Sequence, residues 1–372
     1  MHEPFFHSGD APIIHTSRLT KAFGNIVAVN DLNLQVMRGD VFGFLGPNGS
    51  GKTTTIRMLL GLIRPTAGHA ILFGMDNAYQ LSKILQRIGA IVEMPIFYPY
   101  LSGLDNLRVV AAASGMESGP ANNRRLAEVL DIVDLRAFQK VAFRKYSLGM
   151  KQRLGIAAAL LTDPELVLLD EPTNGLDPAG VFEIRQLIQR LSALGKTIFI
   201  SSHILYEVQH VCNRVAIMQK GNLVQQGYVS DLLRPSEQVT IRLESEEETL
   251  TARAILEQAR EQGATWISRT TIERDRQNQL TLLVAAPITH SSEVNALLAR
   301  RDIFAAEIRP REGSLEEVFL QLTTPTAQPG QPAGSRVGMA ALAPSPVTIM
   351  TPDTQQVSQA GSNASERLKA HE

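Results

Sequence analysis

The feature that most constrains this chain is a glycine-rich loop that fits the pattern G-x-x-x-x-G-K-[ST]. Its residues are Gly46, Pro47, Asn48, Gly49, Ser50, Gly51, Lys52 and Thr53. The apolar run Val41–Leu45 precedes the loop, and a helical run, Thr54–Gly61, follows it. Glycines let backbone N–H groups close around phosphate oxygens, and the start of the following helix adds partial positive charge. The sequence therefore predicts an α/β fold in which strand, phosphate-binding loop and helix follow one another.

The end of this loop carries groups suited to a nucleoside triphosphate and a metal ion. Lys52 is expected to reach the β- and γ-phosphates, and the Thr53 hydroxyl is expected to ligate the Mg²⁺ that bridges them. Thr54, the next residue, is included among the cofactor-binding residues. An ordinary glycine-rich turn is the alternative interpretation, and the flanking strand and helix argue against it. ATP and Mg²⁺ are thus the predicted cofactors.

A second motif is the apolar strand Leu166–Leu169, which ends in two carboxylates. Asp170 is expected to hold Mg²⁺, directly or through water, and is a candidate metal ligand beside Thr53. Glu171 faces the other way and is positioned to polarise the attacking water as general base. Alone, this pattern is more often an ordinary strand end. In a chain that also contains the phosphate-binding loop, this pattern predicts ATP hydrolysis.

Short β-rich runs alternate with helical segments from Ile13 to about Gly227. Because several of these runs are apolar throughout, they predict a mainly parallel sheet covered on both faces. Residues of about 101–161 interrupt the alternation and indicate a helical insertion. The expected strands are Val41–Leu45, Ala70–Phe73, Ala90–Glu93, Leu166–Leu169, Thr197–Ser201 and Val215–Met218, and the expected helices include Leu104–Ala113, Asn122–Val133, Lys151–Leu161 and Pro178–Leu194.

A smaller βαββαβ pattern follows Arg234-Pro235 and matches a ferredoxin-like arrangement. Its expected elements are Gln238–Leu243, Thr249–Arg260, Ala264–Thr270, Gln279–Ala285, Ser291–Arg301 and Ile303–Arg309. Ser314 with Glu317 is a capping-box pattern that predicts a further helix. The predicted organisation is an ATP-binding domain at 13–232, a small α+β domain at 236–323, and a disordered tail at 324–372, which is rich in Pro, Ala, Gln, Ser, Thr and Gly.

Composition excludes several classes of protein. With 372 residues and a formal net charge of −1, the chain gives no electrostatic indication of a nucleic-acid partner. Its single cysteine, Cys212, cannot form an internal disulfide, which fits a reducing cytosol. No stretch approaches the roughly 18 apolar residues that span a bilayer, and the first residues lack a signal-peptide pattern. Any membrane role is therefore expected to depend on a partner.

With these two motifs in place, the chain resembles the ATP-binding-cassette (ABC) family. The stretch Tyr146–Arg153 is similar to the family signature L-S-G-G-Q, in which Ser147 and Gly149 match. A serine hydroxyl and backbone N–H groups at the start of a helix can hold a γ-phosphate. Asp177 lies in a segment, Gly175–Pro178, that resembles the family loop making contacts across a dimer. Read alone, that aspartate would be a helix cap.

Two more positions match the family residue by residue, and a third departs from it. His203, after the strand Thr197–Ser201, resembles the histidine that contacts the γ-phosphate and completes the catalytic pair with Glu171. Phe23 resembles the aromatic that stacks on adenine, although an isolated aromatic is more often a core residue. Glu93 stands where the family usually has a glutamine; its carboxylate can ligate Mg²⁺ or bind a water.

The resemblance covers roughly 13–322 and points to the bacitracin- and daunorubicin-type exporter subgroup. It implies that ATP lies between Lys52, Thr53 and Asp170 of one subunit and Ser147 and Gly149 of another. A homodimer is the simplest arrangement, with a paralogous ATPase as the alternative. A separate membrane-spanning permease would carry the substrate, whether drug, antibiotic-like, lipid-like, ion or peptide. The chain would then lie at the cytoplasmic face of the plasma membrane.

Two other readings remain open. The first is a soluble cassette ATPase acting in DNA repair, on ribosomes or in cluster assembly. No long coiled coil separates the two motifs and only one cassette is present, which argues against the DNA-repair and ribosome types. Cluster assembly stays possible but does not explain the C-terminal domain. The second reading is a nucleotide-gated regulatory module with negligible turnover, and Glu171 and His203 argue against it.

Overall fold

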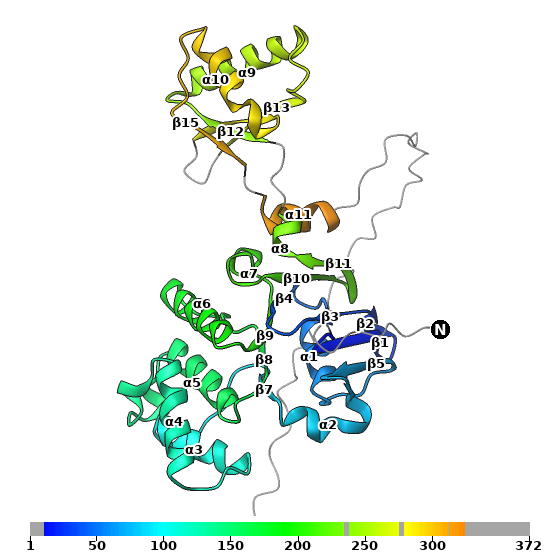
Figure 1. Cartoon of the computed structure of the whole chain (residues 1–372), viewed down its shortest axis with the longest axis vertical. Coiled ribbons are helices and arrows are strands. Elements are labelled where there is room, and N and C mark those ends of the chain that lie inside the picture. Colours follow the sequence, from blue (N-terminus) through cyan, green and yellow to red (C-terminus); the bar gives the residue numbers. More distant parts are fainter. Residues whose placement is uncertain (1–10, 234–237, 275–278, 312, 324–372) are drawn as a thin grey trace, which may run out of the picture. The chain divides into compact units, whose positions relative to one another are not determined.

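The computed structural model describes residues 11–233, 238–274, 279–311 and 313–323. Its main sheet has the strand order β11-β10-β4-β9-β8-β7, in which neighbours from β10 to β7 are parallel and β11 pairs antiparallel at the edge (Figure 1). This confirms the predicted mainly parallel α/β sheet. The strands are β4 (Val41–Leu45), β7 (Ile88–Ile91), β8 (Leu166–Asp170), β9 (Thr197–Ser202), β10 (Arg214–Gln219) and β11 (Asn222–Tyr228).

Both faces of this sheet are buried, because successive side chains on a strand point to opposite faces. Phe42, Phe44 and Phe199 belong to one apolar cluster, which also contains buried residues of α1 (Lys52–Leu59). Leu169 and Ile200 belong to the other cluster, together with residues of the helices on the opposite side. Burial on two sides explains why the strands are apolar throughout.

A second, antiparallel sheet covers the α1 side, and the sequence did not predict it. Its strand order is β2-β1-β5-β6, with β3 pairing with β1. The prediction of Ala70–Phe73 as part of the parallel sheet was wrong, because this segment pairs antiparallel with β1. Its strands are half-buried rather than apolar throughout. They are β1 (Ile14–Phe23), β2 (Ile26–Leu32), β3 (Gln35–Val36), β5 (Ala67–Leu72) and β6 (Met75–Asp76).

Helices cover the other face, and three of them lie within the predicted insertion. The helix α5 (Leu148–Leu160) begins earlier than the expected Lys151, because the Ser147 hydroxyl caps it by accepting a hydrogen bond from the Met150 N–H, 3.2 Å away. Residues 148–150 of the signature therefore lie in the first turn. The other helices on this face are α3 (Gly103–Ala113), α4 (Pro120–Ile132), α6 (Pro178–Ala193), α7 (Leu205–Val211) and α8 (Val229–Leu232), whereas α2 (Asn77–Leu85) packs against β5 and β6 of the antiparallel sheet.

One exposed ion-pair cluster joins the starts of three strands of the main sheet. Glu165, just before β8, lies 2.6 Å from Arg38 Nη1 and 2.5 Å from Arg87 Nε. The hydrogen bond from Arg87, supported by Arg38, lowers the pKa of Glu165 from 4.5 to about 2. Arg38 precedes β4 and Arg87 precedes β7, so the cluster fastens the edge of the sheet opposite to the phosphate-binding loop.

We expect this cluster to make stability pH-dependent in one direction. Because the pKa of Glu165 is lower in the folded chain, its contribution is present above the ordinary value of 4.5 and is lost as the pH falls toward about 2. Since the carboxylate is substantially exposed, the contribution at neutral pH is expected to stay below about 1 kcal/mol. Urea unfolding of the wild type and Glu165→Gln should show a small difference at pH 7 that shrinks below pH 4.5. A difference that grows in acid would contradict this assignment.

Residues 238–274 and 279–311 contain a further antiparallel sheet, which has four strands in the order β13-β14-β12-β15. Two helices, α9 and α10, pack with this sheet around one apolar cluster. The order of elements, βαββαβ, is compatible with a ferredoxin-like arrangement, which stays a prediction, as do the domain boundaries. The elements are β12 (Val239–Arg242), α9 (Glu246–Glu261), β13 (Arg269–Arg274), β14 (Leu280–Ala285), α10 (Ser291–Ala299) and β15 (Glu307–Pro310).

Two strands of this part were predicted in the wrong place. The expected strand Ala264–Thr270 is mostly a turn after α9, and β13 begins only at Arg269. Similarly, the first four residues of Ile303–Arg309 form a loop, and β15 begins at Glu307. In both segments a buried isoleucine, Ile267 or Ile303, fills the core from a connecting loop, which mimics the pattern of a strand.

A last helix, α11 (Leu315–Thr323), begins where the sequence predicted one. The Ser314 hydroxyl accepts a hydrogen bond from the Glu317 N–H at 3.1 Å, as in a capping box. Leu315 is fully buried, and its N–H donates to Gln209 Oε1 of α7 at 3.1 Å. The predicted tail, 324–372, lies outside the described residues. Within the described part, no helix is both long and apolar enough to cross a bilayer.

Candidate functional site

The glycine-rich loop lies between β4 and α1, and its backbone requires glycine. Gly49 and Gly51 have φ values of 79° and 104°, in the left-handed region. A Cβ on Gly51 would also lie 2.5 Å from the carbonyl oxygen of Ala28. The helix begins directly after this loop, so that Lys52 and Thr53 occupy its first turn. The first N–H groups of α1 therefore lack helical partners and face the loop.

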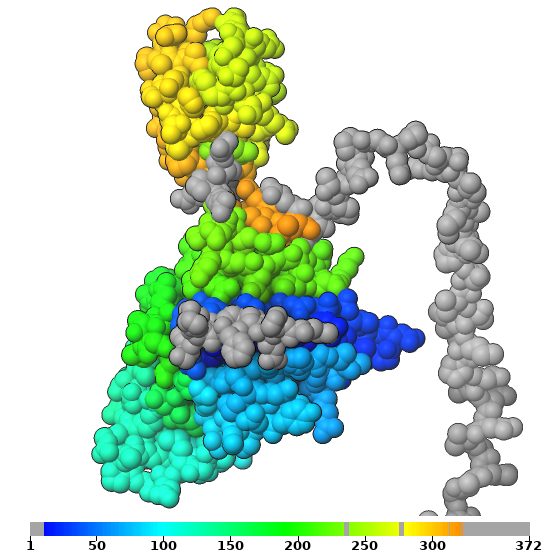
Figure 2. Space-filling view, turned by 45° about the vertical axis from the view of Figure 1, so that its right-hand side comes forward, coloured from blue at the N-terminus to red at the C-terminus, as the bar shows by residue number. Residues whose placement is uncertain are grey.

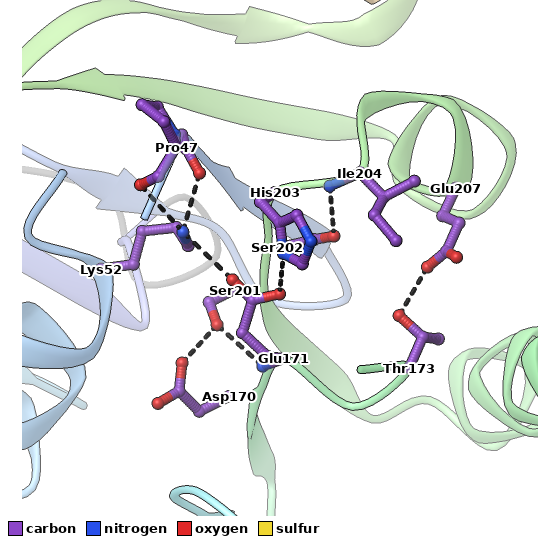
Figure 3. A network of polar contacts seen from close by, with 11 residues as sticks. Pro47, Lys52, Asp170, Glu171, Thr173, Ser201, Ser202, His203, Ile204 and Glu207 are labelled. Atoms are coloured by element: carbon purple, nitrogen blue, oxygen red, sulfur yellow. Dashed lines mark hydrogen bonds and ion pairs between the residues drawn. The ribbon is translucent and has the colours of Figure 1, made fainter. Parts of the chain in front are cut away.

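Lys52 connects this loop to the acidic end of β8. Its side chain is only 5% exposed, and Nζ donates to the carbonyl oxygen of Gly46 at 2.7 Å and that of Pro47 at 3.3 Å. The same Nζ lies 3.1 Å from Glu171 Oε1 (Figure 3). The loop lysine and the predicted general base thus form an ion pair.

Glu171 is also held on its other side. Its Oε2 lies 2.7 Å from His203 Nδ1, so the carboxylate sits between Lys52 and His203 (Figure 3). The backbone of Glu171 has a φ of 49°, which is rare for a residue with a side chain. Asp170 is 5% exposed, and its Oδ1 accepts a hydrogen bond from the Ser201 hydroxyl.

The topology of the sheet explains why these residues meet. The loop follows β4, Glu171 follows β8, and His203 follows β9. Strand β9 lies between β4 and β8, and all three run parallel, so their carboxyl ends share one edge of the sheet. In open α/β sheets, ligands bind outside this edge.

The loop and strand ends fit ATP and Mg²⁺ by their chemistry. The Ser50 hydroxyl is buried in the loop without a hydrogen-bond partner in the described chain, and phosphate oxygens could supply one. Among the described residues, no group of three or more His, Cys, Asp or Glu residues is arranged to hold a metal ion. Mg²⁺ in nucleotide sites needs only one or two protein ligands beside the phosphates, and Thr53 with Asp170 would provide them.

Ser147, Gly149 and Asp177 lie at the starts of two helices. Ser147 caps α5, and Gly149 lies in the first turn of that helix. Asp177 caps α6 through a 2.9 Å hydrogen bond from the Gly180 N–H to Oδ1. These contacts account for the local helix starts. Roles of Ser147, Gly149 and Asp177 in nucleotide binding across a dimer stay predictions.

Two further predicted residues lie at the surface. Phe23 ends β1 and is 51% exposed, with Lys21 Nζ 4.9 Å from its ring centroid. The hairpin of β1 and β2 forms part of the blue surface in Figure 2. About half of the Phe23 side chain is exposed, and its stacking on adenine stays a prediction. The Glu93 carboxylate is 65% exposed and forms an ion pair with Arg57 of α1. Its predicted role as a metal ligand is therefore in competition with this arginine.

Sequence reasoning missed three polar residues around the site. Ser201 contacts Asp170 and Glu171, while the Thr173 hydroxyl donates to Glu207 Oε2 of α7 at 2.6 Å. A signal for Ser201 was present, because two serines end the otherwise apolar strand β9 beside the acidic end of β8. Thr173 and Glu207 are far apart in sequence and gave no such signal.

The fold and site together define a P-loop nucleotide-binding protein. Residues 29–174 match the sequence profile of the family described as ABC transporter. The bacitracin transport ATP-binding protein BcrA of Bacillus licheniformis is 51% identical over 215 residues, which cover 58% of this chain and 69% of that protein. The uncharacterised ABC transporter ATP-binding protein YdbJ of Bacillus subtilis is 36% identical over 322 residues, 86% of this chain and 98% of that protein.

Solved structures agree with this assignment. A dimeric ATP-binding cassette in a post-hydrolysis state with ADP and Pi has a TM-score of 0.53 and 27% identity, covering 58% of this chain and 98% of that chain. The chain belongs to the family of ABC transporter ATP-binding proteins. It is an ATP-binding subunit, and ATP hydrolysis is the activity characteristic of its family.

Proposed function

We propose that two copies of this chain hydrolyse ATP at sites closed between them. Lys52, Thr53 and Asp170 of one copy would bind the phosphates and Mg²⁺, and Ser147 with Gly149 of the other would cover the γ-phosphate. The observation that carries the proposal is the Glu171 carboxylate, held between Lys52 at 3.1 Å and His203 at 2.7 Å. The proposed ATP-binding domain is 13–232, with 236–323 as an accessory domain.

Each residue has a distinct task in this mechanism. Bound ATP would offer phosphate oxygens to Lys52 Nζ in place of its present partners, the loop carbonyls and Glu171. Glu171 Oε1, released from the lysine, could then accept a proton from the attacking water. His203 would keep the carboxylate oriented through Oε2. Mg²⁺ would neutralise the charge that develops on the phosphates.

A surface groove supports a permease partner. It is lined by residues of β7, the segment after it, α2, α3 and α5, including Val92, Pro95 and Phe97. At this groove Ile96 is 95% exposed and Met94 is 62% exposed, and such apolar exposure is typical of protein-binding surfaces. We propose that a membrane-spanning permease docks here, with the chain at the cytoplasmic face of the plasma membrane. Because a relative is named for bacitracin transport, we propose antibiotic-like compounds as the substrates and export as the direction of transport.

Mixing two inactive variants tests the shared site. Lys52→Ala and Ser147→Arg should each abolish ATPase activity as homodimers. In a mixed dimer one site carries both changes and the other carries neither. An equimolar mixture should therefore recover up to about a quarter of wild-type activity. Activity in either pure variant, or none after mixing, would count against a site shared by two copies.

A pull-down from native membranes tests the permease. The tagged chain should retain a multi-spanning membrane protein, and Ile96→Asp should release it without changing the ATPase activity of the purified chain. Tyr79→Asp is the matched control, because Tyr79 is 86% exposed on α2 and does not line the groove. Recovery of active protein only in the soluble fraction would favour a cytosolic cassette ATPase.

A further inference from the structure

The described residues include one buried hydroxyl that contacts both carboxylate residues of the site. We infer that Ser201 is a positioning residue for ATP hydrolysis, which sets the orientation of the Asp170 carboxylate and fixes the backbone of Glu171. The inference rests on the proposed roles of these two residues in metal binding and proton transfer. Ser201 itself is not expected to touch ATP or the metal.

The contacts of Ser201 are made across the sheet. Ser201 of β9 pairs with Asp170 of β8 in the parallel register, and it is fully buried. Its hydroxyl donates to Asp170 Oδ1, and the same oxygen accepts the N–H of Glu171 at 2.9 Å (Figure 3). The Ser201 carbonyl oxygen lies 3.2 Å from that N–H and accepts from it as well.

One hydroxyl makes both side-chain contacts at this place. An amide N–H needs an acceptor and an ionised carboxylate needs a donor, and a serine oxygen is both. With Oδ1 of Asp170 engaged by the serine, Oδ2 is the oxygen left to face a metal ion. Groups that hydrogen-bond a metal-binding carboxylate orient it, and their loss typically weakens metal binding about 10- to 100-fold.

The hydrogen bond between Ser201 and the Glu171 N–H affects the position of the proposed general base. Glu171 has left-handed backbone geometry, with a φ of 49°, and such geometry persists only where surrounding contacts enforce it. The Ser201 hydroxyl and carbonyl hold its N–H directly. This backbone turn brings the side chain between Lys52 and His203. Loss of a hydrogen bond to the Glu171 N–H should let the Glu171 carboxylate move away from its position between Lys52 and His203.

The neighbouring serine provides a matched control. Ser202 is also buried, at 2% exposure, in the same strand. Its hydroxyl accepts from the Ile204 N–H at 3.0 Å, and the contacts to Asp170 and Glu171 described above come from Ser201. Removing either hydroxyl takes one acceptor from a part-buried backbone N–H, that of Glu171 or that of Ile204. The two alanine variants therefore lose one such contact each, and Ser201→Ala also loses the hydrogen bond to Asp170.

The test measures metal binding separately from turnover. Binding of Mn²⁺, as a stand-in for Mg²⁺, is followed by electron paramagnetic resonance on the full chain with a non-hydrolysable ATP analogue. Ser201→Ala should weaken Mn²⁺ binding about 10- to 100-fold. Ser201→Thr keeps the hydroxyl and should bind within about threefold of wild type, as should Ser202→Ala. Unchanged Mn²⁺ affinity in folded Ser201→Ala would overturn the inference, as would equal weakening in Ser202→Ala.

Two additional sets of variants separate a folding defect and a failure of the proposed function from a failure of this inference. If Ser201→Ala does not fold, Ser201→Cys replaces it, because a thiol of similar shape is only a weak donor. Weakened Mn²⁺ binding by the cysteine variant supports the inference and wild-type binding overturns it. Asp170→Asn and Glu171→Gln test the underlying function: if both retain full ATPase activity, the proposed function fails. If they lose activity while Ser201→Ala binds Mn²⁺ normally, only the role of Ser201 fails.

Discussion

Replacing Glu171 by glutamine should lower steady-state ATP turnover about 10²- to 10⁴-fold, the range that general-base catalysis usually contributes. The amide keeps the size of the side chain but cannot accept the proton of the attacking water. ATP binding should be retained, because the contacts expected of Lys52 and the loop backbone with the phosphates do not involve this carboxylate. Phosphate release gives the turnover, and equilibrium binding of a fluorescent ATP analogue gives the affinity.

Glu165→Gln is the appropriate control for this experiment. Glu165 precedes β8 and Glu171 follows it, so the two changes remove equal charge from opposite ends of one strand. Near-wild-type turnover is expected for the control at pH 7, because Glu165 contacts only arginines at the far edge of the sheet in the interactions described above. Near-normal ATPase activity in Glu171→Gln would overturn the assignment of this residue as general base.

The main sheet was predictable because its strands are buried on both faces. Runs such as Val41–Leu45 and Leu166–Leu169 are apolar throughout, and burial alone explains that pattern. The antiparallel sheet was not predictable in the same way. Strand β1, Ile14–Phe23, mixes buried, intermediate and exposed positions, and a left-handed residue, Arg18, interrupts its alternation. Its pairing with β5 depends on contacts distant in sequence.

The centre of the site could also be read from the sequence, since each residue follows a predicted strand. Lys52, Glu171 and His203 come after β4, β8 and β9, and neighbouring parallel strands end at the same edge. The sequence did not predict which partner each of the other side chains contacts. Arg57 pairs with Glu93, and Ser201 binds Asp170, and both choices depend on rotamers and strand register.

Replacing Phe199 by alanine should lower the free energy of unfolding by about 3–5 kcal/mol, the usual cost of removing a buried aromatic ring. Phe199 is fully buried in β9, 5.6 Å from the ring of Phe42 and 5.3 Å from that of Phe44 between centroids. Phe182, which is 55% exposed on α6, is the control, and Phe182→Ala should change stability by less than about 1 kcal/mol. Urea unfolding monitored by circular dichroism measures both.

The same substitution connects the core to the site. Phe199 and Ser201 are two residues apart on one strand, so their side chains leave the sheet on the same face. A cavity at Phe199 should therefore loosen the strand that positions Ser201 against Asp170. We expect Phe199→Ala to lose ATPase activity at temperatures below its unfolding transition, while Phe182→Ala does not. If activity persists up to the transition, packing beneath β9 contributes to folding alone, and the hydrogen bonds of Ser201 suffice to hold the site.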